Sequence, residues 1–399
     1  MSTAVLTNPR IELDSVADTA LKVAARFWFG VTVIGQLAFA IAVAIFYGLT
    51  AWRGDYHAWK FTNGFVPGVT KGNLAVVVHL VTAVVIMLAG AVQLVPQVRS
   101  RFPVVHRWNG RIYMLSAVVL SAAGVYMHWI RGAVGDFSQH LGATVNAVLI
   151  WGCAAMALHY ALARDFKTHR RWALRLFMVV SASWFLRIML FLSFLVFKGP
   201  VGFDPTTFTG PFLTFMIFAQ FLLPLGFLEI YLRAQDHPGA LRRIATAGML
   251  FVLTIAMAIG LFAVTMAIWV PDVKAGFDPR RSISETLSAT IASNGLDAAL
   301  KQYRELKATT AATYNFDEDQ LNALGYQLIR TKKFPEAIRI LQLNVEAFPQ
   351  SSNAYDSLGE AYMDDGEKEL AISNYQKSLE LNPKNRNGAV MLQKLNARQ

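Results

Sequence analysis

Seven apolar stretches between residues 27 and 270 constrain this chain more than any other feature. A hydrocarbon core of about 30 Å is crossed by roughly 20 apolar helical residues. Because unpaired backbone groups are costly in lipid, each stretch is expected to be a helix rather than a lone strand. The sequence therefore predicts an all-α fold that begins with a seven-transmembrane helix bundle. The predicted spans are 27–49, 74–96, 112–130, 141–163, 176–197, 211–232 and 247–270.

Composition divides the chain into two bodies. Of the 399 residues, 54% are hydrophobic and only 16% are charged, which is too apolar for one water-soluble globule. Before residue 272 the chain has 21 Lys and Arg against 9 Asp and Glu, and afterwards 16 against 17. We therefore predict an N-terminal tail (1–26), a seven-helix transmembrane domain (27–270), a linker (271–283) and a soluble helical repeat domain (284–399).

Loop charges predict the orientation of the spans. Alternate loops, beginning with the N-terminal tail, hold 15 cations, whereas the other loops hold five. Cytoplasmic loops are enriched in Lys and Arg, so the tail is expected in the cytoplasm of a bacterial inner membrane. An odd number of spans then places the repeats in the periplasm or outside the cell. The same bias explains the basic pI, so nucleic-acid binding is not expected.

A 34-residue spacing recurs near the C-terminus. Leu324-Gly325 matches Leu358-Gly359, Ala337 matches Ala371, and Pro349 matches Pro383. This pattern resembles the tetratricopeptide repeat, and residues 295–307 resemble an earlier, incomplete unit. The resemblance implies stacked antiparallel helix pairs that bind a protein or peptide through residues 284–399. The alternative is an appendage that stabilises only its own membrane domain.

Histidines sort by predicted depth into two layers, which points to a cofactor. His79 and His140 are expected near the outer face, and His106 and His169 near the inner face. Paired imidazoles from two helices form the ligand set of b-type haem. The alternation resembles the cytochrome b561 class of transmembrane electron carriers, which implies haem b at both layers. No other metal site is expected, because the chain has a single cysteine, Cys153.

Arginines surround the inner histidines, and this departs from that class, whose ligands lie within apolar helix. We predict that five of them form a cationic collar for lipid phosphates, haem propionates or an anionic solute. The alternative is that they reflect the orientation bias alone. The five are Arg101, Arg107, Arg111, Arg170 and Arg175.

The same loops carry a family resemblance. The run His106-Arg107-x-x-Gly110-Arg111-x-Tyr113 and the patch around His169 resemble a bacterial family of predicted membrane proteins, catalogued as domain of unknown function 2306. The resemblance covers about residues 70–235. It implies a multi-helix membrane fold and supplies no established activity.

Two ionisable residues fall inside predicted spans. Arg187 lies near the centre of the fifth span, and Glu229 lies near the inner end of the sixth. Because charge at that depth is costly, both side chains must face protein or water. They indicate either a proton or anion pathway or polar contacts that hold helices together.

Two classes of function remain from the sequence. The first is a haem-binding carrier that moves electrons across the bilayer. The alternative is a non-enzymatic sensor, transport or assembly factor that binds membrane lipid or an anionic solute. The sequence contains no GxxxxGK[ST], HExxH or GxSxG motif, and we identify no catalytic residue.

Overall fold

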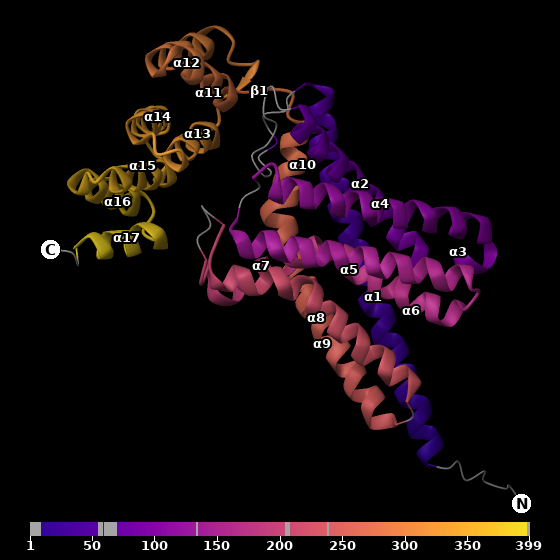
Figure 1. Ribbon diagram of the computed structural model, residues 1–399. Helices are drawn as coiled ribbons and strands as arrows, with labels where there is room; N and C mark the ends of the chain where they lie inside the picture. Colours follow the sequence, from indigo (N-terminus) through magenta and orange to yellow (C-terminus); the bar gives the residue numbers. More distant parts are fainter. Residues whose placement is uncertain are drawn as a thin grey trace, which may run out of the picture. The chain divides into compact units, whose positions relative to one another are not determined.

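The computed structural model describes residues 9–54, 59, 70–132, 135–203, 208–237 and 239–396. The chain divides into two compact units, Met1–Phe277 and Asp278–Gln399 (Figure 1). Both units are helical, which confirms the predicted all-α class.

The first unit contains the predicted membrane helices. Six are long and apolar enough to span a bilayer, and a bent pair makes a seventh. A short helix, α3 (Pro96–Arg101), lies between the second and third spans, and α9 continues through η2 (Thr265–Trp269) into α10 (Val270–Phe277). The spans are α1 (Pro9–Trp52), α2 (Thr70–Leu94), α4 (Pro103–Trp129), α5 (Phe137–Leu162), α6 (Phe166–Val180) with α7 (Ala182–Phe197), α8 (Pro211–Asp236) and α9 (Ala240–Val264).

These helices close into a bundle. α1 packs against α2 and α9, α2 against α4, α4 against α5, and α5 against α6 and α8, while α7 joins α8 and α9. Trp184 and Phe221 are fully buried in the main core. On the outside, Ile34 and Leu115 are 66% and 67% exposed. Many such apolar side chains on the surface are typical of helices surrounded by lipid.

The fifth span is broken at Ser181. α6 and α7 meet there at 53°. The amide Nε2 of Gln36 on α1 donates a hydrogen bond to the Ser181 hydroxyl at 3.0 Å, and both residues are at most 1% exposed. This buried contact ties α1 to the junction of α6 and α7.

The second unit is a stack of three helix pairs and a final helix. The incomplete unit expected at residues 295–307 corresponds to α12, which is the second helix of the first pair because α11 precedes it. The two-residue strands β1 (Arg281–Ser282) and β2 (Tyr314–Asn315) pair in parallel. The helices are α11 (Ile283–Asn294), α12 (Leu296–Thr309), α13 (Glu318–Arg330), α14 (Phe334–Ala347), α15 (Ser352–Asp365), α16 (Lys368–Leu381) and α17 (Arg386–Asn396).

Small residues allow the paired helices to approach. A Cβ on Gly359 of α15 would lie 3.2 Å from the ring of Tyr375 on α16. A Cβ on Gly325 of α13 would lie 2.6 Å from Leu341 on α14. The glycines therefore allow close contact with the large side chain of the partner helix, as tetratricopeptide-like packing requires.

Candidate functional site

The histidines predicted to form the outer layer lie on α2 and α5, with further contacts from α4. His79 of α2 places its Nδ1 3.3 Å from the carbonyl oxygen of Leu120 on α4. Gly124, one turn further along α4, faces the same ring, with its ideal Cβ position 3.8 Å from His79 Cε1. A ring nitrogen that donates to a backbone carbonyl fixes the tautomer and leaves Nε2 with its lone pair.

A third histidine joins this layer. The rings of His128 on α4 and His140 on α5 have centroids 5.4 Å apart, and Trp129 lies 5.4 Å from His140 on another side. Nδ1 of His128 and Nε2 of His140 are buried and have no hydrogen-bond partner among the described residues.

The sequence pairing did not select His128, although a signal was present. His128 is the second-last residue of α4 and His140 the fourth of α5, so a short connection brings them to the same depth. Antiparallel neighbours joined by a short loop are expected to align in this way.

The inner layer is built on the opposite ends of the helices. His106 of α4 places its Nε2 3.4 Å from the amide nitrogen of Gln93 on α2, and its buried Nδ1 has no partner among the described residues. His169 of α6 holds its Nδ1 2.8 Å from the carbonyl oxygen of Ala157 on α5. His106 and His169 interact electrostatically.

Gln93 connects the inner layer to a polar network between α2 and α4. Asn109 donates from Nδ2 to the Gln93 side-chain oxygen at 2.9 Å and to the carbonyl oxygen of Ala89 at 2.8 Å. Neither residue was selected from the sequence. A Gln and an Asn near the ends of neighbouring spans were the available signal, because buried amides require partners.

This donor set fits haem in its chemistry. His79 and His169 each turn Nδ1 toward a carbonyl of the neighbouring helix, which leaves Nε2 for iron. His140 and His106 each carry a buried nitrogen without a partner among the described residues. Among the residues that the structure describes, no group of three or more His, Cys, Asp or Glu side chains is placed to hold a metal ion directly.

The five arginines of the predicted cationic collar have different surroundings. Arg175 binds Glu229 of α8 through Nε at 2.7 Å and Nη2 at 3.0 Å, and it lies 4.7 Å above the Trp172 ring. Arg111 lies 4.8 Å above the ring of Trp108. The remaining three, Arg101, Arg107 and Arg170, are exposed.

The two intramembrane ionisable residues do not form a pair with each other. Glu229 is the partner of Arg175. Arg187 is partly buried, donates from Nη1 to the carbonyl oxygen of Ser183 at 2.7 Å, and lies 5.2 Å from the Phe39 ring. Both residues therefore make contacts that join helices, as a packing role requires.

Buried and partly buried polar side chains connect successive helices of the repeat unit. Tyr326 of α13 donates its hydroxyl to Glu360 of α15 at 2.8 Å. Asp356 accepts hydrogen bonds from Asn385 and Asn387 at 2.8 Å each. Burial raises the pKa of Glu360 above its ordinary value. These contacts join successive repeats along one face.

The fold and the two histidine layers define a multi-pass α-helical membrane protein that carries a helical repeat module. Residues 76–223 match the family described as predicted membrane protein (DUF2306), and this segment contains all four predicted haem ligands. Residues 352–385 match the tetratricopeptide repeat family. No curated protein matches the chain.

Proposed function

We propose that the membrane body is a haem-binding carrier that moves electrons across the bilayer. The observation that carries the proposal is the placement of four histidines in two layers on α2, α4, α5 and α6. His79 and His169 each hold Nδ1 against a backbone carbonyl, the arrangement that orients an axial imidazole. The family match over residues 76–223 supports a membrane role and gives no activity.

In this proposal each layer has its own ligand pair. His79 and His140 would hold one haem, and His106 and His169 the other, with Arg107 and Arg170 available for propionates. Bound haem would supply reversible one-electron chemistry. Along α2, His79 is 14 residues from Gln93, the neighbour of His106. At a rise of 1.5 Å per residue, this corresponds to about 21 Å. The protein would then link donors and acceptors at opposite membrane faces.

The test is the absorption spectrum of the full chain, purified from cells with ample haem. The wild type should show a Soret band, and His79→Leu with His140→Leu should remove about half of it, as should His106→Leu with His169→Leu, because each layer holds one haem. His159→Gln is the control: His159 lies on α5 outside both pairs, with its ring edge-on to Tyr160 at a centroid distance of 5.1 Å. A colourless wild type would refute the proposal, as would equal loss in the control.

A second role is proposed for the repeat module, namely binding of a protein partner. The stack of helix pairs and the match at residues 352–385 support it. A photo-crosslinking residue at exposed Asp364 on α15 should capture a partner, and one at exposed Lys377 on α16 should not. Crosslinks to the same chain's membrane body alone would instead support a stabilising appendage.

The alternative class is a non-enzymatic sensor, transport or assembly factor that binds lipid or an anionic solute. The exposed Arg101, Arg107 and Arg170 favour it, because a guanidinium binds phosphate and carboxylate groups well. A colourless protein that retains anionic lipid only when these arginines are present would support this class.

A further inference from the structure

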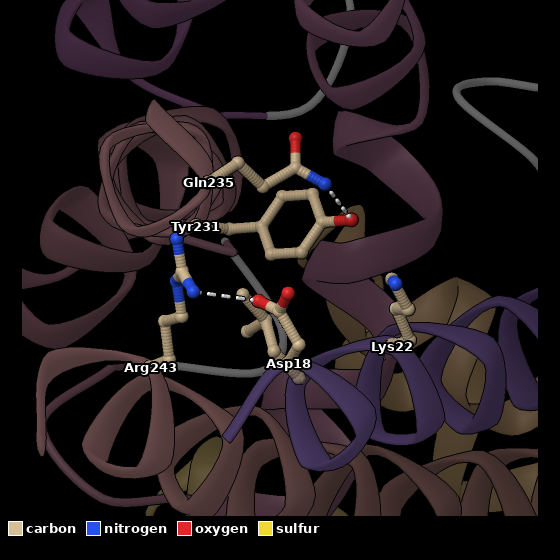
Figure 2. Close-up of a pocket in the computed structure, with 6 residues that line it drawn as sticks. Asp18, Lys22, Tyr231, Gln235 and Arg243 are labelled. Atoms are coloured by element: carbon tan, nitrogen blue, oxygen red, sulfur yellow. Dashed lines mark hydrogen bonds and ion pairs between the residues drawn. The ribbon is translucent and has the colours of Figure 1, made fainter. Parts of the chain in front are cut away.

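We propose that the pocket between α1, α8 and α9 binds the phosphate group of an anionic membrane lipid. The pocket has a volume of about 230 Å³ (Figure 2). Its walls come from the third and fourth turns of α1, the first turn of α9 and the last turns of α8. The lining residues are Asp18, Leu21, Lys22, Tyr231, Gln235 and Arg243.

Most polar groups in the pocket have their partners inside it. Arg243 binds Asp18 through Nη1 at 2.8 Å, which neutralises the one carboxylate of the lining. Gln235 donates from Nε2 to the Tyr231 hydroxyl oxygen at 2.7 Å, so the O–H of Tyr231 remains as a donor. Figure 2 shows both contacts.

Lys22 supplies the positive charge that the pocket does not neutralise. Within the described residues Lys22 makes no ion pair or hydrogen bond. With Asp18 and Arg243 paired, the lining carries a net charge of one positive unit, from Lys22. Arg170 adds a further cation within electrostatic range of Tyr231. A pocket that offers an ammonium and a phenol donor to an open space is complementary to an anion.

Size and position favour a lipid headgroup. Pockets for complete drug-sized ligands span about 300–1,000 Å³, so about 230 Å³ suits a smaller group. Leu21 of the lining packs with Ala24 of α1 and with Ala247 and Leu250 of α9 in an apolar cluster. Lys22 lies on α1, five residues before the predicted apolar stretch 27–49. A charged mouth above apolar helix is the setting in which basic side chains meet anionic headgroups.

The test measures lipid binding to the delipidated full chain by native mass spectrometry. Probes are phosphatidylglycerol, zwitterionic phosphatidylcholine and water-soluble glycerol phosphate. Variants are Lys22→Gln, Lys22→Arg and the matched control Arg242→Gln, which removes an exposed cation next to Arg243 but outside the lining. Lys22 is exposed, so its replacement should leave the thermal midpoint unchanged.

Lys22→Gln should weaken phosphatidylglycerol binding about tenfold, the equivalent of one charged hydrogen bond. Lys22→Arg and Arg242→Gln should bind as the wild type does, and phosphatidylcholine should bind weakly to all. Equal weakening in Arg242→Gln, or no effect of Lys22→Gln, would overturn the site. Glycerol phosphate binding as tightly as the lipid would overturn the lipid assignment. Lipid binding here does not require haem at either histidine layer.

Discussion

Replacing Glu229 by Gln tests whether the Arg175–Glu229 pair stabilises the membrane body. The guanidinium makes two hydrogen bonds to the carboxylate, at 2.7 and 3.0 Å. Hydrogen bonds to charged groups contribute about 1.5–3 kcal/mol. The side chains are 21% exposed for Arg175 and 38% for Glu229, so solvent screening lowers this estimate to about 1–2 kcal/mol.

The assay is the midpoint of heat-induced loss of the monodisperse peak in detergent. A domain of this size shifts by about 2–4 °C per kcal/mol, so Glu229→Gln should lower the midpoint by about 2–8 °C. The double variant with Arg175→Gln should recover part of the loss, because no charge is then left unpaired. Glu305→Gln, at the Lys301–Glu305 pair whose side chains are 80% and 62% exposed, is the control and should change little. An unchanged midpoint in Glu229→Gln, or strict additivity in the double variant, would refute this reasoning.

Three further predictions concern the repeat module and the orientation. Gly325→Ala should destabilise the repeats by about 1–3 kcal/mol, because the new Cβ meets the fully buried side chain of Leu341. Circular dichroism of the full chain would detect this as a lower midpoint of thermal unfolding. An unchanged midpoint would contradict the packing. Burial raises the pKa of Glu360, so the native state holds the proton of this carboxyl group more tightly than the unfolded state does. The stability of the module therefore falls as the pH rises from the ordinary carboxyl range through the raised pKa. Glu360→Gln should therefore stabilise the module at pH 7 and lose that advantage near pH 4; a pH-independent difference would contradict this. A reporter active only in the cytoplasm, fused after Gln399, should stay silent, and a signal would reverse the proposed orientation.

The apolar spans were predictable because their signal is long and local. Six expected stretches overlap single helices long enough to span a bilayer, and the stretch 176–197 overlaps the bent pair α6–α7. The 34-residue spacing located the helix pairs α13–α14 and α15–α16, the second of which matches the repeat family. The contact at the bend was not predictable, since the partner of Ser181 is Gln36, which is 145 residues away in the chain. Contacts between distant polar residues leave no periodicity in a sequence.

The same distinction applies to the candidate sites. Depth follows from position along a span, so the sequence predicts two histidine layers, and these stay a prediction. Which side chain faces which depends on the rotation of each helix, and this is how His128 came to lie beside His140. The partner of Arg175 could not be predicted from the sequence either, because Glu229 lies on another helix, α8, and the two residues meet only when the helices pack. Lys22 and Arg243 share a pocket for the same reason.

The most direct test of the central proposal is the number of haem groups bound per chain. Haem extracted into pyridine and quantified against protein by amino-acid analysis gives this ratio for the full chain in detergent. Two layers of paired imidazoles predict two b-type haems per chain, falling to one when His79 and His140 are both replaced by Leu. A ratio near zero in the wild type, from cells with ample haem, would contradict the electron-carrier proposal.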